Sequence, residues 1–359
     1  MHSEGSDHAK GWQRWQEHLA VTSEAYRRLK AEQVAGWNSP SLDAFYKKEK
    51  DTAAPRHSQR QAGTTAFHDA DTERQAKRYR DHVARIFAGD PLLSQSVGML
   101  GKRTFLDLGA SPGGVTRYFH DDLGWVGTAV SLAERDGGIP MEPPKENPKH
   151  YIFVEGSILD DSLGDMLQNK ARLQLHSCDF CNAGAVQDYG QRADEASETA
   201  PPADTTTRLP WIAFLAPQLK MCLQFVKPGG SVMFVFGLSD CGSLMLLLHY
   251  LGPMVRGGIR VLPTMHVAKS PVYVLLSNVH YDETSYRDLS SALERPKGHW
   301  LLHNDTDFTR ASAQFDGVVR RSLEDVWRGR EEKMRSKREF IEKSHEGNKQ
   351  QKRSRLEGI

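Results

Sequence analysis

The sequence predicts an α/β protein built around a mostly parallel β-sheet. From about residue 70 to residue 282, short apolar runs typical of strands alternate with segments of helical periodicity. Strands that alternate with helices need crossover connections, and these place helices on both faces of a parallel sheet. A glycine-rich turn at 109–114 joins the first apolar run to a helical segment. Both ends of the chain are helical in pattern, so we expect helical extensions on either side of the sheet domain.

The composition excludes several classes of protein. Of 359 residues, 38% are hydrophobic and 26% are charged, and the 47 basic and 46 acidic side chains leave a net charge of +1. This balance excludes a uniformly basic nucleic-acid coat, so contact with a polyanion must be local. Four cysteines are too few for a disulfide framework. The first twenty residues lack the apolar run of a signal peptide, and polar residues interrupt the most apolar stretch. We therefore expect an intracellular protein without a membrane partner, in the nucleus or the cytoplasm.

Seven strands and four main helices are expected in the sheet domain. The strands are predicted at 104–108, 126–132, 151–154, 173–178, 232–236, 259–262 and 272–276. No helix separates the last two, so they should close the sheet as an antiparallel hairpin. Helices are predicted at 72–87, 113–123, 211–226 and 242–251. The polar, proline-containing segment 184–208 is expected to be a mobile surface loop.

The two ends are assigned to separate extensions, 1–66 and 283–359, around a domain at 67–282. In the first extension, apolar residues recur at helical spacing in Trp12, Trp15, Leu19, Tyr26 and Leu29. We favour an amphipathic helix that packs on the domain, and stacking on nucleic acid is the alternative. Residues 49–66 have no periodicity and are interpreted as a linker.

The last part of the chain is basic. Residues 328–359 contain eleven Lys or Arg and six Glu, a net charge of +5 (11 − 6). A solvated helix is the favoured interpretation, and an arm that binds an RNA phosphate backbone is the alternative. The basic helix at 72–87 is a second candidate RNA contact, and the sequence does not identify a protein partner.

The glycine turn is the most informative motif. It reads Phe-Leu-Asp-Leu-Gly-Ala-Ser-Pro-Gly-Gly over 105–114. Glycines allow a sharp turn and close approach to a ligand, and the helix that follows offers free N–H groups. The spacing is neither the G-x-G-x-x-G of dinucleotide binders nor a phosphate-binding P-loop. A nicotinamide enzyme also has an acid at the end of its second strand, where this chain has Ser131.

LDLGASPGG resembles the first motif of S-adenosylmethionine-dependent methyltransferases. It is most similar to the L-D-L-G-x-x-P-G-G form of the FtsJ-like ribose 2′-O-methyltransferases, of the RrmJ type. The resemblance covers roughly 70–282, and KPGG at 227–230 matches the turn before the family's fifth strand. It implies a Rossmann-like class I methyltransferase fold, with seven mostly parallel strands and an antiparallel last strand, and S-adenosyl-L-methionine as the cofactor.

The resemblance also implies a set of cofactor-binding residues. The turn would line the methionine part of the cofactor, with Asp107 orienting it. Ser131 and Leu132 lie where the cofactor's ribose is bound, and Ser157 lies where the family often has an acid for the adenine, with Asp160 as a substitute. The residues of the turn are Gly109, Ala110, Ser111, Pro112, Gly113 and Gly114.

Asp179 is the principal candidate catalytic residue. By resemblance it matches the acid that ends the fourth strand beside the transferred methyl group, and it is also a candidate cofactor contact. The alternative is a cap on a helix or turn. An acid after a buried strand lies at the carboxyl edge of the sheet, where such folds bind ligands, and this favours a functional role.

The rest of the family's catalytic set, two lysines and a glutamate, is incomplete. The fifth strand has Phe or Val where a lysine is expected, and Pro271 stands in the place of the glutamate. Lys77 is the candidate for the first lysine, with Arg80 and Arg85 as alternatives, and Lys269 is a further hypothesis for the vacated space.

No metal site is predicted. Cys178 and Cys181 have the spacing of metal ligands, but no second pair accompanies them, and a buried thiol beside a loop thiol is favoured. His299 and His303 suggest no third ligand, and His176 is interpreted as a core histidine on a strand.

The predicted function is S-adenosylmethionine-dependent methyl transfer, with RNA as the substrate class that the resemblance implies. Two alternatives remain open. One is a catalytically degenerate methyltransferase-like module that binds RNA or a protein. The other is a methyltransferase for a small molecule or a protein, whose acceptor needs no lysine.

Overall fold

The computed structural model of this chain describes residues 4–47, 65–89, 103–141, 150–186, 211–237, 241–267, 271–294 and 305–357. Its centre is a seven-stranded sheet in the order β3-β2-β1-β4-β5-β7-β6. The strands are β1 (Thr104–Leu108), β2 (Val126–Ser131), β3 (Tyr151–Glu155), β4 (Cys178–Ala183), β5 (Val226–Gly237), β6 (Val255–Pro263) and β7 (Pro271–Val279).

The topology confirms the predicted fold class. Strands β3, β2, β1, β4 and β5 pair in parallel, and β7 runs antiparallel to both β5 and β6. The last two strands therefore close the sheet as the expected hairpin. This is the Rossmann-like, mostly parallel sheet with an antiparallel last strand that the resemblance implies.

One strand was misplaced in the sequence analysis. The fourth strand was predicted at 173–178, but β4 begins at Cys178 and ends at Ala183. The residues before it form a turn in which Arg172 and His176 have positive φ angles of 53°. A strand was predicted over 173–178, which includes His176, because leucines alternate with polar residues there, yet Leu175 is 49% exposed. His176 is therefore an exposed turn residue and not a core histidine.

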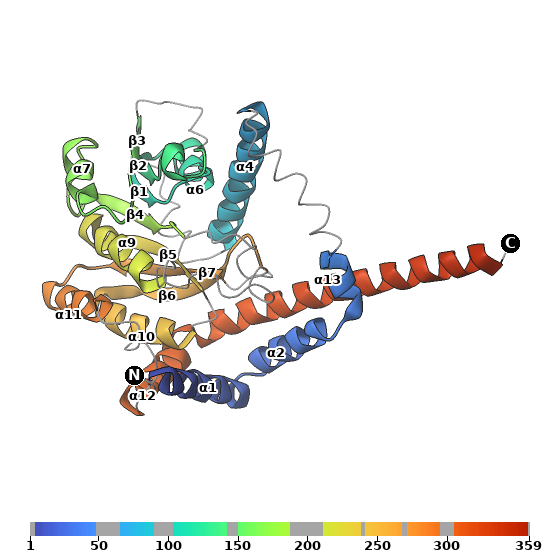
Figure 1. The fold of residues 1–359 in the computed structure, drawn as a ribbon. Helices are drawn as coiled ribbons and strands as arrows, with labels where there is room; N and C mark the ends of the chain where they lie inside the picture. Colours follow the sequence, from blue (N-terminus) through green and yellow to red (C-terminus); the bar gives the residue numbers. More distant parts are fainter. Residues whose placement is uncertain are drawn as a thin grey trace.

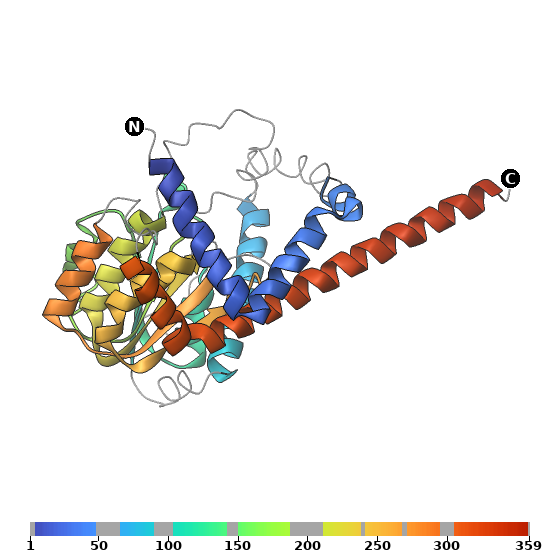
Figure 2. The same ribbon diagram turned by 90° about the horizontal axis from the view of Figure 1, so that it is seen from below.

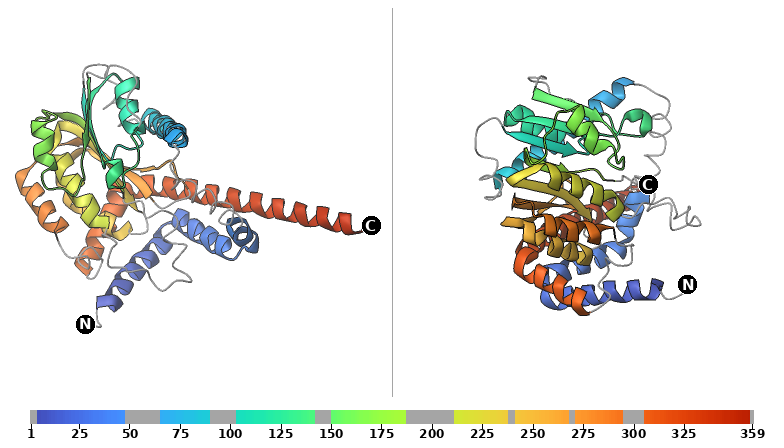
Figure 3. Two further views of the ribbon diagram at one scale, coloured as in Figure 1. Left: turned by 45° about the horizontal axis from the view of Figure 1, so that its top comes forward. Right: turned by 90° about the vertical axis from the view of Figure 1, so that its left-hand side faces the viewer.

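Helices cover both faces of the sheet (Figures 1 and 3). On one face lie α4 (Thr65–Gly89), α6 (Gly114–Arg117) and its wider-turned continuation η1 (Tyr118–Asp122). On the other face lie α7 (Leu163–Asn169), α9 (Trp211–Phe225), α10 (Cys241–Leu251) and α11 (Glu283–Leu293). The glycine-rich turn between β1 and α6 thus connects a strand to a helix in the middle of the sheet.

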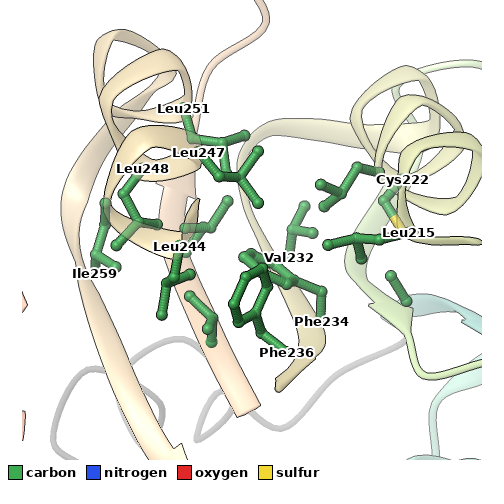
Figure 4. Close-up of a cluster of buried hydrophobic side chains, with 14 of the residues drawn as sticks. Leu215, Cys222, Val232, Phe234, Phe236, Leu244, Leu247, Leu248, Leu251 and Ile259 are labelled. Atoms are coloured by element: carbon green, nitrogen blue, oxygen red, sulfur yellow. The ribbon is translucent and has the colours of Figure 1, made fainter. Parts of the chain in front are cut away.

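The core has a layer on each side of the sheet. Figure 4 shows part of the larger one, where leucines of α10 point toward the aromatic and β-branched side chains of β5. The smaller layer is aromatic and lies under α4 and η1. Its fully buried rings are Phe87, Phe105, Phe119, Trp125 and Phe180. Rings of this size bury much apolar area, so these two layers stabilise the sheet from both faces.

The extensions at the two ends of the chain pack on each other. Helices α1 (Glu4–Thr22) and α2 (Glu24–Trp37) lie beside α12 (Asp305–Gln314) and the long α13 (Arg320–Glu357), as Figures 1 and 2 show. Tyr26 of α2 meets Trp327 of α13 with ring centroids 5.2 Å apart. The buried residues Trp15, Leu19 and Leu29 belong to the same hydrophobic cluster as the sheet. The first extension is helical as predicted, but the contacts described for it are with the C-terminal helices and not with the sheet domain on which it was expected to pack.

The C-terminal extension also covers one edge of the sheet. β6 is the last strand in the sheet order, and the Val261 N–H donates a hydrogen bond to the Ser322 Oγ of α13 over 3.2 Å. A side-chain oxygen thus replaces the missing neighbouring strand at this point, which blunts an edge that would otherwise offer unpaired backbone groups.

None of the described helices combines the length and the apolar character that crossing a membrane requires.

Candidate cofactor site

The glycine turn is held by hydrogen bonds to its own residues and to β2. The N–H groups of Gly109 and Ala110 both donate to the Val130 carbonyl over 2.9 Å, and the Gly113 N–H donates to the Ala110 carbonyl over 2.7 Å. Gly109 and Gly113 have φ angles of 76° and 106°. Residues with a Cβ rarely adopt these angles, so glycine is required for the shape of the turn.

The turn lies between two other segments at close range. A Cβ added to Gly109 would lie 2.3 Å from the Cα of Ala185, just after β4. A Cβ on Gly114 would lie 2.3 Å from the Cβ of Tyr79 on α4. Real Cβ atoms never come this close to their neighbours, so both glycines permit the packing of the turn. Gly109 and Ser111 keep partial exposure, and the other residues of the turn are buried.

Asp107, at the end of β1, links this turn to β4. Its side chain is buried. One carboxylate oxygen accepts a hydrogen bond from the Thr116 Oγ1 over 2.6 Å, and the other accepts one from the Asn182 Nδ2 over 2.8 Å. Burial raises the pKa of Asp107, and these hydrogen bonds partly offset the effect. Because Thr116 lies on α6, Asp107 fixes the helix that follows the turn, as an orienting residue must.

Asn182 is a site residue that the sequence analysis missed. It pairs with Asp107 in the parallel register, so the two side chains lie on the same face. Asn182 is buried, and its Oδ1 has no hydrogen-bond partner within the described part of the chain. An unpaired buried acceptor is costly unless a ligand or water satisfies it. Correct placement of β4 would have identified Asn182 as the polar residue at its carboxyl end.

The residues assigned to the ribose and adenine have varied surroundings. The Ser131 Oγ lies 2.6 Å from the Ser111 Oγ, which ties the end of β2 to the glycine turn. Leu132 is 38% exposed beside it. The Ser157 Oγ accepts from the Leu159 N–H over 3.2 Å, and the exposed Asp160 accepts from the Ser162 N–H over 2.9 Å. Their cofactor contacts stay predictions.

The prediction that Asp179 ends the fourth strand is wrong. Asp179 is the second residue of β4, at the edge of the sheet opposite the glycine turn. The strand then runs four residues further to Ala183, about 13 Å at roughly 3.3 Å per residue. At the beginning of β4, the Asp179 carboxylate accepts a hydrogen bond from the Thr104 N–H over 3.0 Å and forms an ion pair with Lys227 over 2.5 Å. It joins the beginnings of three strands and has no place beside the transferred methyl group or the cofactor.

Lys77 lies on α4 and is exposed. The atoms nearest to a Cβ added at Gly114 belong to Ala76, Tyr79 and Arg80 of α4. Arg80 forms an ion pair with Asp122, which raises the pKa of the guanidinium. Arg85 is exposed and donates to the Asp81 carbonyl over 3.1 Å. A catalytic role for Lys77 stays a prediction.

The other side of the turn, toward β5, β7 and β6, is lined by aromatic residues. Tyr79 meets His266, which follows β6, with ring centroids 6.4 Å apart. Tyr273 of β7 is buried and lies near His82 of α4, with centroids 6.2 Å apart. Burial, with the nearby Tyr79 and Asp107, raises the pKa of Tyr273. β5 contributes apolar residues, and β7 begins with Pro271. Lys269 lies outside the described residues.

No metal centre is found among the described residues. Cys178 and Cys181 both lie in β4, and both are buried with Cys222 in the hydrophobic core. Neither is a loop thiol, as one of them was expected to be. Burial and the neighbouring thiols raise the pKa of Cys181 well above its usual range, so it is a poor metal ligand. His299 and His303 lie outside the described residues.

The comparison with protein families decides the assignment. The model of the FtsJ-like methyltransferases matches residues 93–250, which include the glycine turn, β1 to β5 and most of α10. This segment is therefore similar to the FtsJ-like methyltransferases. The protein is accordingly an S-adenosylmethionine-dependent methyltransferase, and S-adenosylmethionine is its cofactor. No curated protein matches the chain.

Several solved structures are similar to this chain. TnmH is 18% identical, with 70% of this chain and 68% of TnmH covered and a TM-score of 0.31. Human methyltransferase-like protein 13 in complex with SAH is 12% identical, with coverage of 62% and 94% and a TM-score of 0.36. An rRNA methylase from Streptococcus thermophilus is 9% identical, with coverage of 53% and 98% and a TM-score of 0.32.

The residues present fit the cofactor. Its methionine end carries an ammonium group, and the orphaned acceptor of Asn182 beside the Asp107 carboxylate is suited to a cationic donor. S-adenosylmethionine supplies a methyl group activated by a sulfonium. The chain's own contribution is to hold the cofactor and the acceptor in line.

Proposed function

We propose that this FtsJ-like methyltransferase methylates RNA, on a ribose 2′-hydroxyl. The observation that carries the proposal is the family match over 93–250, together with the complete L-D-L-G-x-x-P-G-G motif. The exposed basic residues Lys77 and Arg78 of α4 support it, because α4 contacts the glycine turn through Tyr79. A polyanion bound along α4 would lie close to the cofactor.

The chain divides the work between two sets of residues. The turn, Asp107 and Asn182 would hold the methionine end of the cofactor. Tyr79 and His266 would form the wall against which the target nucleoside rests, because an aromatic face stacks on a base or a sugar. The acceptor proton has to leave during transfer, and His266, which is exposed, is a group able to accept it.

A second candidate is methylation of a small molecule or a protein. It is favoured by one specific observation: the described residues at the ends of β4 and β5 and at the start of β7 include no lysine or carboxylate. Those residues are Ala183, Gly184, Ala185, Phe236, Gly237, Pro271 and Val272. A ribose hydroxyl is a weak nucleophile that gains from such groups, whereas a more acidic acceptor needs less help.

The experiment that separates the two uses S-adenosylmethionine labelled on the transferred methyl group. The purified protein is incubated with total RNA, with a protein lysate or with a metabolite extract, and the label is located. Gly109→Val, which places a branched side chain where even a Cβ does not fit, serves as the inactive control.

We expect label in RNA, released by nuclease digestion as 2′-O-methylnucleosides that block alkaline cleavage at the modified position. Label in RNA bases would show that the ribose is not the acceptor, while RNA would remain the substrate. Label confined to protein or small molecules would establish the second candidate.

A further inference from the structure

A basic and aromatic face lies on α13, away from the glycine turn. Lys333, Lys337 and Phe340 follow one another at spacings of four and three residues, so they share one side of the helix. All three are exposed, and Phe340 is 69% exposed. Tyr46, from the helical segment 40–47, lies beside them and is 44% exposed. We call these four residues the basic-aromatic face.

The face is held in place by contacts between the two ends of the chain. Arg338 donates to both carboxylate oxygens of Glu32 on α2, over 2.7 and 3.0 Å. The Ser39 Oγ donates to Glu342 over 2.7 Å. The Lys337 ammonium lies 4.7 Å from the centre of the Tyr46 ring. This part of α13 is therefore packed against the N-terminal extension, and it is not surrounded by solvent on all sides as the favoured interpretation expected.

Charge is segregated around this part of α13. At about 100° per residue, the positions within about 60° of Phe340 contain no acidic residue. They are Lys333, Ser336, Lys337, Lys343, Ser344 and Gly347. Two of the glutamates are engaged with arginines elsewhere on the helix: Glu331 with Arg335 and Glu342 with Arg338. Lys333 and Lys337 have no acidic residue three or four positions away on the helix.

This combination has the chemistry of a single-stranded nucleic acid site. Lysines attract phosphates without reading sequence, and exposed aromatic rings stack on unpaired bases. Phe340 and Tyr46 provide rings, and Lys333 and Lys337 provide charge on the same side. We propose that the basic-aromatic face binds single-stranded RNA and so holds the substrate while another part of it is methylated, an inference that rests on the proposed RNA acceptor.

The test measures binding of a fluorescein-labelled, unstructured 20-nucleotide RNA to the full chain by anisotropy, over a range of salt concentrations and without S-adenosylmethionine. Two variants alter the face: Lys333→Gln with Lys337→Gln, and Phe340→Ala. The matched control is Lys170→Gln with Arg256→Gln, which removes the same charge from exposed positions on α7's end and on β6. Circular dichroism checks that every variant keeps the helical content of the parent.

We expect the double lysine variant to reduce the slope of log affinity against log salt by about 1.4, at roughly 0.7 for each phosphate contact. Phe340→Ala should weaken binding about 5- to 150-fold, the usual loss for one stacked base, and Phe340→Trp should restore it. The control should leave both quantities unchanged.

Equal effects of the control and the face variants would overturn the proposal, as would no binding by the parent. A parent that binds an acidic protein fraction and not RNA would assign the face to a protein partner, and would overturn it too. Methyl transfer is measured separately. If the parent methylates RNA and the face variants bind RNA normally, the proposed RNA binding by the basic-aromatic face is wrong and the proposed RNA methylation is retained. If the variants lose RNA binding and the parent never methylates RNA, the proposed RNA methylation is wrong and the proposed RNA binding by the face is retained.

Discussion

Asp179 and Asn182 lie on the same strand, and their substitution by alanine should have opposite consequences. Asp179→Ala removes the acceptor of the Thr104 N–H and Oγ1 and the partner of Lys227, at the edge of the sheet away from the cofactor. We expect Asp179→Ala to lower the free energy of unfolding and to leave cofactor binding and methyl transfer by the folded protein unchanged.

The magnitude follows from the contacts. The Asp179 side chain is only 10% exposed, so the loss of its hydrogen bonds leaves a largely buried N–H unpaired at a cost of about 1–3 kcal/mol. Lys227 is 44% exposed, so solvent screens that ion pair and its loss adds no more than about 1 kcal/mol. A total of about 1–4 kcal/mol corresponds to a fall in Tm of roughly 2–15 °C.

The assay is thermal and urea unfolding of the parent, Asp179→Ala and Asn182→Ala, followed by calorimetry with S-adenosylmethionine at a temperature where all three are folded. Asn182→Ala should weaken cofactor binding by about tenfold or more, because it removes the acceptor beside Asp107 and a charge-assisted hydrogen bond. If Asp179→Ala abolished cofactor binding or transfer and left Tm unchanged, the placement of β4 would be refuted.

Three further predictions concern the turn, its acid and the joined ends. Gly109→Ala should abolish S-adenosylmethionine binding in calorimetry, because its Cβ would lie 2.3 Å from Ala185 and a positive φ adds about 1–2 kcal/mol of strain. The pKa of Asp107 is raised in the folded protein, so the unfolded chain loses this proton at a lower pH than the folded protein does. The free energy of unfolding should therefore fall as pH rises above about 4. Asp107→Asn should flatten that part of a urea-unfolding profile against pH, and an unchanged profile would contradict the assignment. Glu32→Ala leaves the partly buried Arg338 without its bidentate partner, so we expect a loss of about 1–3 kcal/mol in urea unfolding that Arg338→Leu in the same chain largely recovers.

The sequence was sufficient for the fold because the signals of fold class are local. Alternating apolar runs identified six of the seven strands near their observed positions, and the glycines of the turn required a strand-to-helix connection at that point. The antiparallel ending followed from the lack of a helix between β6 and β7. Each of these inferences depends on neighbours in the chain.

The failure at β4 has a physical cause. Leu173 and Leu175 alternate with polar residues as in a strand, whereas the real strand contains Asp179 and Asn182 and is less apolar in sequence. Its partners are β1 and β5, far away in sequence, and only their register shows which polar residue reaches the glycine turn. The pairing of Glu32 with Arg338 was equally invisible, because no local pattern connects residues more than three hundred positions apart.

The contact between the two ends of the chain has a consequence during synthesis. The ribosome releases α1 and α2 long before α13 exists, so Trp15, Leu19 and Leu29 emerge without the helix that later helps to cover them. Closure of such distant contacts is slow, and apolar residues left uncovered meanwhile invite aggregation. A nascent chain of this protein should therefore depend on chaperones until its last helix has been made, and shortening that helix before Arg338 should reduce the yield of soluble protein more than it reduces the activity of each molecule that folds.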